Sequence, residues 1–177
     1  MNTNLFVKKA VENTPKGYAQ QCARQRIYGP DARGSVYITD LTPEAFFKSL
    51  GNCNWVEIND PNIAPGCKGF TTKDLKNGHF GMISISDLPA DTRLEVFRAK
   101  EGAGLSVQVK GTLGPAQEET TIIIGDDGDG WIVFTFYCGP TIPLKEIDEE
   151  IYHEGDIITP AQAIKAGWDW AKIDYRP

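Results

Sequence analysis

The second half of the chain carries five short runs rich in β-branched and aromatic residues, each separated from the next by turn residues. Turn-forming residues such as Gly, Pro and Asp lie between successive runs, and each run has the length of a short strand. In one run Leu105, Val107 and Val109 alternate with polar residues, as in a strand with one face on a core. The sequence therefore predicts an antiparallel meander, with strands at residues 80–85, 93–99, 105–109, 120–124 and 131–137.

Helix signals flank this meander. Thr42 is a good N-cap because Pro43 follows at the first helical position, and Thr159 and Gln162 form a capping box before a helix that ends at Gly167. Further expected elements are helices at 5–12 and 18–25, strands at 35–39, 53–58 and 168–173, a loop at 59–69 and a polar turn at 71–78. The expected fold class is α+β, a mainly antiparallel, twisted sheet of about six to eight strands flanked by two or three short helices.

The chain has 177 residues, which suits a single domain over residues 1–177, with residues 1–33 as a basic helical appendage. We expect no signal peptide, because the start has lysines and no apolar h-region. We expect no membrane span, because Pro140 and Pro143 break the longest uncharged run. The cysteines form no Cys-x-x-Cys pair, so reduced thiols in a cytoplasm are the simplest expectation. A bridge between Cys53 and Cys67 is the alternative for an exported protein.

The net charge of -6 is unevenly distributed. Residues 1–100 contain 13 basic and 10 acidic residues, and residues 101–177 contain 5 and 14. The first 33 residues are the most basic portion, and we interpret their charges chiefly as a solvated surface, with contact to phosphate or an acidic partner as the alternative. An acidic chain is nevertheless a poor general nucleic-acid binder. The basic residues of this portion are Lys8, Lys9, Lys16, Arg24, Arg26 and Arg33.

The sequence DDGDG, residues 126–130, raises the question of a cation site. It fails the EF-hand pattern, because a loop that begins at Asp126 places Gly128 and Gly130 at ligand positions and Tyr137 where a glutamate is needed. Gly and Asp also favour tight turns between strands, and we interpret the segment as a hairpin turn. We expect neither a metal nor a cofactor. A weak surface site at Asp126 and Asp129 is the alternative.

Two histidines are candidates for chemistry. His153 lies among carboxylates and is expected at the surface. His79 lies between glycines at the start of a strand, where an imidazole can act as an acid or base or can bond to a backbone carbonyl. With Arg98 to bind a phosphate and Thr135 to orient it, His79 would complete a metal-independent endoribonuclease, so the predicted catalytic residues are His79, Arg98 and Thr135. Arg93, Thr120 and Thr121 are the alternatives for the last two roles.

A second enzyme hypothesis makes Cys138 a nucleophile activated by His79, although the same cysteine also suits a buried sheet face with Ile132, Phe134 and Phe136. Trp168 and Trp170 are expected to share one face of the last strand.

Because no catalytic set is complete, the leading hypothesis is a small accessory or regulatory protein that binds a macromolecular partner through its charge and aromatic surface. A protein partner is expected, with RNA as an alternative through the basic N-terminal segment.

Overall fold

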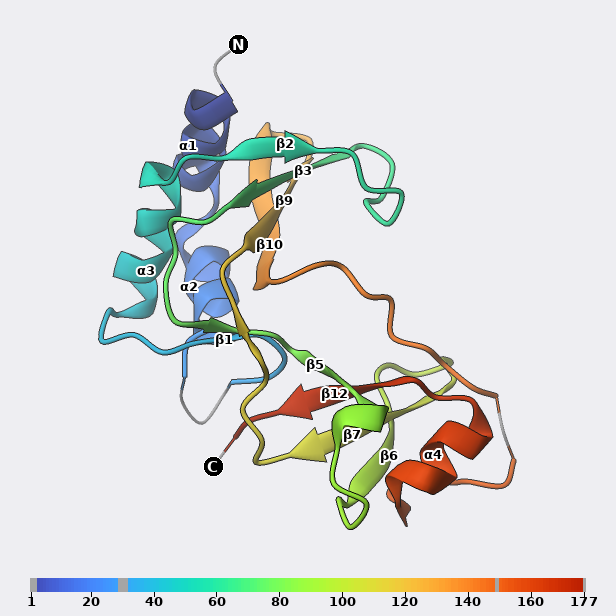
Figure 1. Cartoon of the computed structure of the whole chain (residues 1–177). Helices are drawn as coiled ribbons and strands as arrows, with labels where there is room; N and C mark the ends of the chain where they lie inside the picture. The colour runs from blue at the N-terminus through green and yellow to red at the C-terminus, as the bar shows by residue number, and fades with distance from the viewer. Residues whose placement is uncertain (1–2, 29–31, 149, 177) are drawn as a thin grey trace.

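The computed structural model describes residues 3–28, 32–148 and 150–176, and its α+β class is confirmed (Figure 1). The helices in this part of the chain are α1 (Thr3–Asn13), α2 (Lys16–Arg24), α3 (Pro43–Ser49) and α4 (Pro160–Ala166), with 3-10 turns η1 (Leu50–Asn52) and η2 (Ile85–Asp87). The strands are β1 (Val36–Tyr37), β2 (Val56–Ile58), β3 (Cys67–Thr72), β4 (Gly78–His79), β5 (Met82–Ser84), β6 (Leu94–Arg98), β7 (Leu105–Lys110), β8 (Ala116–Gln117), β9 (Thr120–Asp126), β10 (Trp131–Cys138), β11 (Ile157–Ile158) and β12 (Trp170–Asp174).

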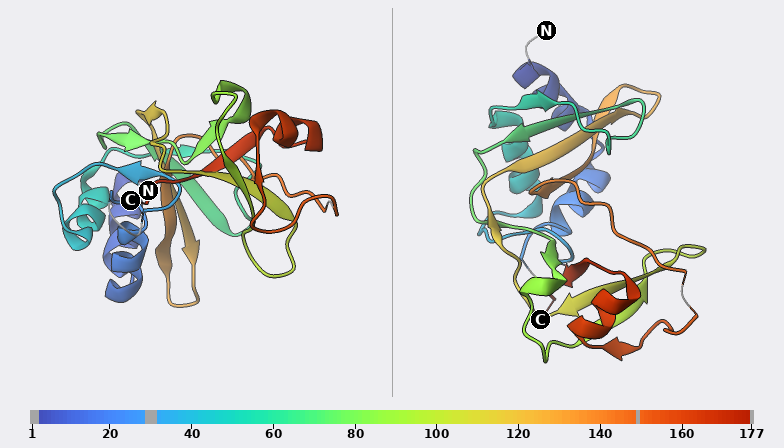
Figure 2. Two further views of the ribbon diagram at one scale, coloured as in Figure 1. Left: turned by 90° about the horizontal axis from the view of Figure 1, so that it is seen from below. Right: turned by 45° about the vertical axis from the view of Figure 1, so that its right-hand side comes forward.

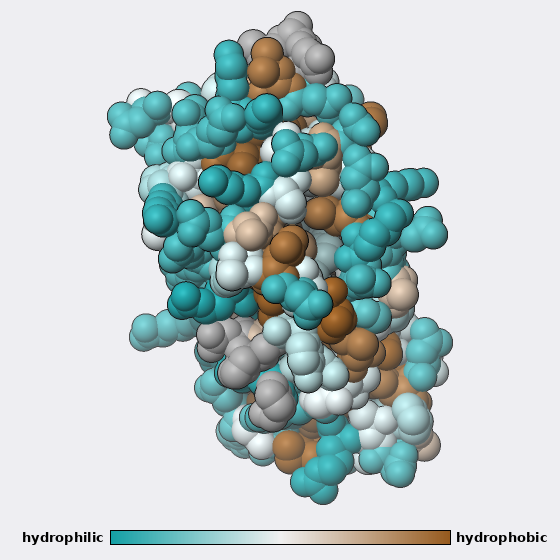
Figure 3. All heavy atoms as spheres, turned by 90° about the vertical axis from the view of Figure 1, so that its left-hand side faces the viewer, coloured by the Kyte–Doolittle hydropathy of each residue, from teal (hydrophilic) through white to brown (hydrophobic). Residues whose placement is uncertain are grey.

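A four-stranded antiparallel sheet of order β10-β9-β3-β2 forms the upper body in Figure 1, with α1, α2 and α3 on one face. Apolar side chains from the helices and the sheet interleave in its core, where Phe46 stacks on Phe136. Helices α1 and α2 both contribute to this core, so most of residues 1–33 packs against the sheet. Figure 3 views the molecule from the side of these helices, and hydrophilic residues cover most of that face.

A five-stranded sheet of order β11-β6-β7-β12-β5 forms the lower body and has its own core (Figures 1 and 2). Helix α4 covers one face, and the buried indole of Trp168 donates to the carbonyl oxygen of Leu105 at 3.2 Å. Strand β12 runs parallel to β7, while the other pairs in this sheet are antiparallel. A small sheet of order β1-β4-β8 lies between the two bodies.

Local signals located both capped helices correctly. Thr42 accepts a hydrogen bond from the Ala45 amide at the start of α3. The capping box of Thr159 and Gln162 is present at α4, and Gly167 ends the helix with a φ of 109°. These predictions are confirmed because capping depends on residues only a few positions apart.

Four sequence expectations differ from the structure. The five runs expected to form one meander are divided between two sheets, with β5, β6 and β7 in one and β9 and β10 in the other. Strand β3 lies in the segment expected as loop and turn, and it is held between β2 and β9. A bulge in β10 at Phe134 shifts the alternation, so Val133 and Phe136 both face the helices. Trp168 is fully buried before β12 begins, whereas Trp170 is half-buried and meets Phe80 edge to face.

The DDGDG segment is a hairpin turn between β9 and β10, as predicted. Asp126 Oδ1 accepts from the amides of Gly128 and Gly130, and the carboxylate of Asp127 accepts from the Asp129 amide. Both glycines have positive φ, which they adopt without the strain of a side chain.

No helix among the described residues is both long enough and apolar enough to cross a membrane.

Candidate functional site

The three predicted catalytic residues come from three different sheets. His79 lies in β4, Arg98 in β6 and Thr135 in β10. The imidazole Nδ1 of His79 is 3.0 Å from the carbonyl oxygen of Gly114. This contact matches the alternative in which His79 bonds to a backbone carbonyl. The guanidinium of Arg98 donates to the carbonyl oxygen of Ala103. Arg98 lines two cavities, and neither His79 nor Thr135 is among the lining residues of either.

Cys138 is buried, with 1% of its surface exposed. Its Sγ packs against Gly78, where an added Cβ would overlap it, and lies 3.7 Å from the carbonyl oxygen of Gln117. Burial raises the pKa of this thiol to about 11. The thiol is therefore protonated at neutral pH, which opposes nucleophilic attack.

The remaining histidine and the acidic residues form no metal centre in the part of the chain that the structure describes. His153 is exposed, as expected, and its Nδ1 lies 3.9 Å from the carboxylate of Asp156.

The strongest candidate site is a cavity of about 710 Å³ where the two bodies meet. Five cationic side chains line it, and the described lining residues include no carboxylate side chain. They come from both ends of the sequence, and we call the cavity they line the basic cleft: Arg24, Arg26, Arg33, Lys172 and Arg176.

Backbone hydrogen bonds between distant segments build the floor of the basic cleft. The Gly34 amide donates to the carbonyl oxygen of Ile173 at 3.0 Å, and the Ile173 amide donates to that of Gly81 at 2.9 Å. Gly81 permits this close approach, because a Cβ there would lie 2.5 Å from the Ser35 nitrogen. The segments that carry Arg33 and Lys172 are therefore held in fixed relative positions.

Arg26 joins the cleft to the edge of the four-stranded sheet. Its Nε donates to the carbonyl oxygen of Phe136 at 2.8 Å, and its Nη1 donates to that of Arg33 at 3.0 Å. These acceptors are neutral, and no ion pair of Arg26 occurs among the described residues. Burial lowers the pKa of Arg26, but a guanidinium stays charged at neutral pH. Among the described residues, the cleft therefore contains a half-buried charge that forms no ion pair.

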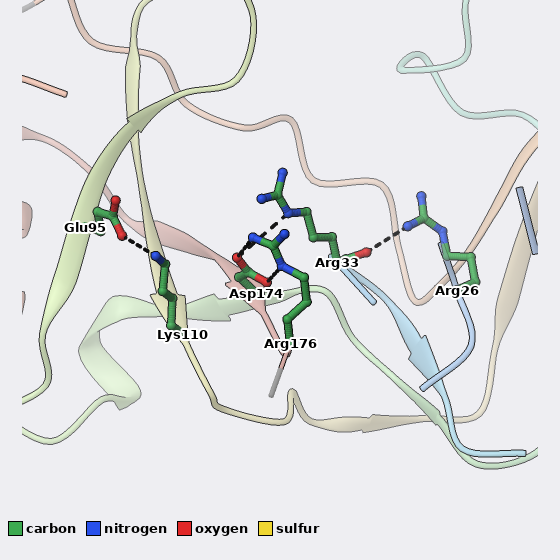
Figure 4. A network of polar contacts seen from close by, with 6 residues as sticks. All are labelled: Arg26, Arg33, Glu95, Lys110, Asp174 and Arg176. Carbon is green, nitrogen blue, oxygen red and sulfur yellow. Dashed lines mark hydrogen bonds and ion pairs between the residues drawn. The ribbon is translucent and has the colours of Figure 1, made fainter. Parts of the chain in front are cut away.

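The carboxylate of Asp174 binds two of the cations at the edge of the cleft (Figure 4). Arg176 donates to its two oxygens at 2.8 and 2.6 Å, and Arg33 Nε lies 3.8 Å from Oδ2. The hydrogen bonds from Arg176 lower the pKa of Asp174, and the charges of Arg176 and Arg33 add to this. This pairing offsets part of the charge of Arg176 and Arg33, and it shows the paired geometry in which a guanidinium binds a carboxylate.

Lys172 contributes a further positive charge from the middle of β12. Burial lowers the pKa of its ammonium group, Arg26 and Arg33 lower it further, and Asp174 acts in the opposite direction. A bound anion would offset this repulsion among cations, so the arrangement is suited to an anionic ligand.

Only three of the five cleft cations lie in the basic portion seen in the sequence. Arg24, Arg26 and Arg33 belong to the basic N-terminal portion, for which contact with phosphate or an acidic partner was the alternative to a solvated surface. Lys172 and Arg176 were not identified, although Lys172 alternates with the buried residues Ala171 and Ile173 and so had to lie on the outer face.

Comparisons with protein-family models, curated proteins and solved structures find no match to this chain.

Proposed function

We propose that the protein is a small accessory or regulatory protein that binds a protein partner by accepting an acidic segment of that partner in the basic cleft. The observation that supports this proposal is the set of five cationic side chains around one cavity whose described lining has no carboxylate. Guanidinium groups bind carboxylates through paired, charge-assisted hydrogen bonds, as Arg176 does with Asp174.

The charge of the whole chain favours a short acidic segment over a long nucleic acid. Outside the cleft the chain is acidic, because removing the five cleft cations from its 18 basic residues leaves 13 to set against 24 acidic residues. A polyanion that extends beyond the cavity would meet this acidic surface, whereas a peptide with a few carboxylates would not. The cavity volume, about 710 Å³, also lies within the range of ordinary ligand pockets.

The test is fluorescence anisotropy with two probes of matched charge, a labelled hexaglutamate peptide and a labelled RNA oligonucleotide. We expect the peptide to bind the wild-type protein more tightly, with an affinity that falls as salt is added. Lys172→Met should weaken peptide binding by about tenfold, the factor that corresponds to loss of one charge-assisted contact. Lys9→Met is the matched control, because Lys9 is exposed on α1 and does not line the cleft.

Equal weakening by the two substitutions would contradict the proposal, since binding would then depend on overall charge. Tighter binding of the RNA would contradict the choice of partner. Cleavage of that RNA by wild type but not by His79→Ala would instead favour the endoribonuclease hypothesis.

A further inference from the structure

Lys172 and Lys110 lie on the same outer face of the five-stranded sheet but have different surroundings. In the register of the sheet, Lys172 is opposite Met82 on β5 and Gln108 on β7, neither of which carries a charge. Lys110 forms an ion pair with Glu95 at 2.8 Å, as Figure 4 shows. Within residues 3–28, 32–148 and 150–176, the Nζ of Lys172 has no hydrogen-bond or ion-pair partner. A half-buried amine of this kind is available to a ligand.

Burial and the nearby arginines lower the pKa of the Lys172 ammonium group, which raises the fraction of neutral amine at a given pH. Arg26 and Arg33 repel an ammonium ion at this position, and partial burial removes part of its hydration. Asp174 favours the charged form, but its carboxylate is already bound by Arg176 and lies near Arg33. A lysine that is partly desolvated beside other cations is activated as a nucleophile.

Lys172 also lines a second cavity of about 380 Å³. Arg33 and Arg176 also line both cavities, so Lys172 shares each cavity with these two cations. The other charged residues around the second cavity are Glu95, Arg98, Lys110, Glu154 and Asp174. A small anion bound by the arginines would therefore be held within reach of the amine.

We propose that Lys172 is the nucleophile of a covalent binding site for small aldehydes or ketones that carry a carboxylate or phosphate group. This inference rests on the anion affinity of the basic cleft in the proposed function, and adds a reactive amine to it. The arginines hold the anionic group, which raises the local concentration of the carbonyl carbon at Nζ.

The reaction is a condensation that needs no oxidant or reductant. The lone pair of the neutral Nζ attacks the carbonyl carbon to form a C–N bond, and the carbonyl oxygen takes up a proton. The nitrogen then loses its remaining protons as the C–N double bond forms, and the oxygen leaves as water. The product is an imine that hydrolyses by the reverse path.

The test uses glyoxylate with cyanoborohydride, which reduces an imine to a stable secondary amine, followed by peptide mass mapping. We expect Lys172 to be labelled about tenfold faster than Lys110 in the same sample, the factor that one charge-assisted contact to the probe provides. Inorganic phosphate should slow the labelling of Lys172 and leave that of Lys110 unchanged. Acetaldehyde, a neutral aldehyde of similar size, should lack this preference for Lys172.

Two variants test the site, so the result does not depend on whether one of them folds correctly. Lys172→Arg should lose the adduct at this position. Arg24→Gln, in an exposed cleft residue, should slow labelling of Lys172 by glyoxylate and not by acetaldehyde.

Equal labelling of Lys172 and Lys110 by glyoxylate would overturn the inference, as would the same preference for Lys172 with acetaldehyde. The hexaglutamate titration on the same protein separates the two proposals. If the peptide binds and Lys172 shows no preference, only the covalent site fails. If Lys172 is labelled selectively and the peptide does not bind, only the acidic-segment proposal fails.

Discussion

Arg26 Nε donates a hydrogen bond to the carbonyl oxygen of Phe136 at 2.8 Å, on the free edge of strand β10. Three other side chains bind the same edge. Thr14 Oγ1 accepts from the Val133 amide, Tyr18 donates to the Phe134 carbonyl, and Ser35 Oγ accepts from the Cys138 amide. An exposed edge strand is a template for pairing with another chain, and these side chains occupy its backbone groups.

Replacing Arg26 by Met should destabilise the fold, because two backbone carbonyls lose a charged donor. We expect the free energy of unfolding in urea to fall by about 2 to 3 kcal/mol. Arg24→Met is the matched control on the same turn of chain, since Arg24 is exposed, and it should change stability by less than about 0.5 kcal/mol. An equal loss in both variants would show that total charge, and not the edge contact, sets the effect.

Thr14→Val tests the edge contact without changing size. The buried Val133 amide would lose its acceptor, so we expect a loss of about 1 to 3 kcal/mol in thermal or urea unfolding. Thr135→Val on the same strand is the control, because no hydrogen bond of the Thr135 hydroxyl occurs in the described structure. A Thr14 variant as stable as the control would mean that another group satisfies the amide.

Asp174 should make stability depend on acidic pH. Its folded pKa lies below the ordinary value, so its contribution is present above the unfolded pKa of about 3.9 and is lost as pH falls through the folded pKa. Near neutral pH, Asp174→Asn should lower the free energy of unfolding by about 1 to 3 kcal/mol. The difference from wild type should shrink below about pH 4 in urea titrations at several pH values. Asp169→Asn, at an exposed residue, should show no such trend.

The four thiols should react in a fixed order with N-ethylmaleimide. Cys67 is half-buried, and the other three are buried. Burial raises the pKa of Cys53 and Cys138 to about 11. Mass spectrometry should therefore find the first adduct at Cys67 in the native protein, and adducts at Cys138 only after unfolding. Fast modification of Cys138 in the folded state would revive the cysteine-enzyme hypothesis.

Gly114→Ala should be strongly destabilising, because a Cβ at this position would overlap the carbonyl oxygen of Phe80. We expect a loss above about 3 kcal/mol, measured as a fall in the urea midpoint. In Gly17→Ala the added Cβ, in α2, meets no atom within 4 Å. This variant should raise the free energy of unfolding by about 0.5 to 1 kcal/mol, because Ala favours the helix more than Gly does. Similar effects of the two substitutions would show that the overlap is relieved by a small backbone shift.

Short-range signals predicted much of the fold. The caps of α3 and α4 and the strands β6, β7, β9 and β10 depend on local spacing, and all were located. Strand β3 was missed because Gly69 and the flanking polar residues resemble a loop. Its extended form depends on hydrogen bonds from β2 and β9, which lie far away in sequence.

The candidate site was predicted less completely for the same reason. The basic N-terminal portion was visible as a cluster of charges, but its approach to Lys172 depends on long-range pairing. His79, Arg98 and Thr135 were grouped by residue type, and the structure places them in separate sheets. Residue type alone does not determine which strands become neighbours.

The bond between Gly34 and Ile173 joins segments from near opposite ends of the chain. Contacts of such long sequence separation form slowly, because much of the loop entropy is lost before they contribute. We therefore expect the cations of the cleft to be brought together late in folding, at a step that their mutual repulsion opposes. An anion that binds only the assembled cleft would stabilise the folded protein relative to the unfolded chain. A small anion could therefore assist folding before the protein meets any partner.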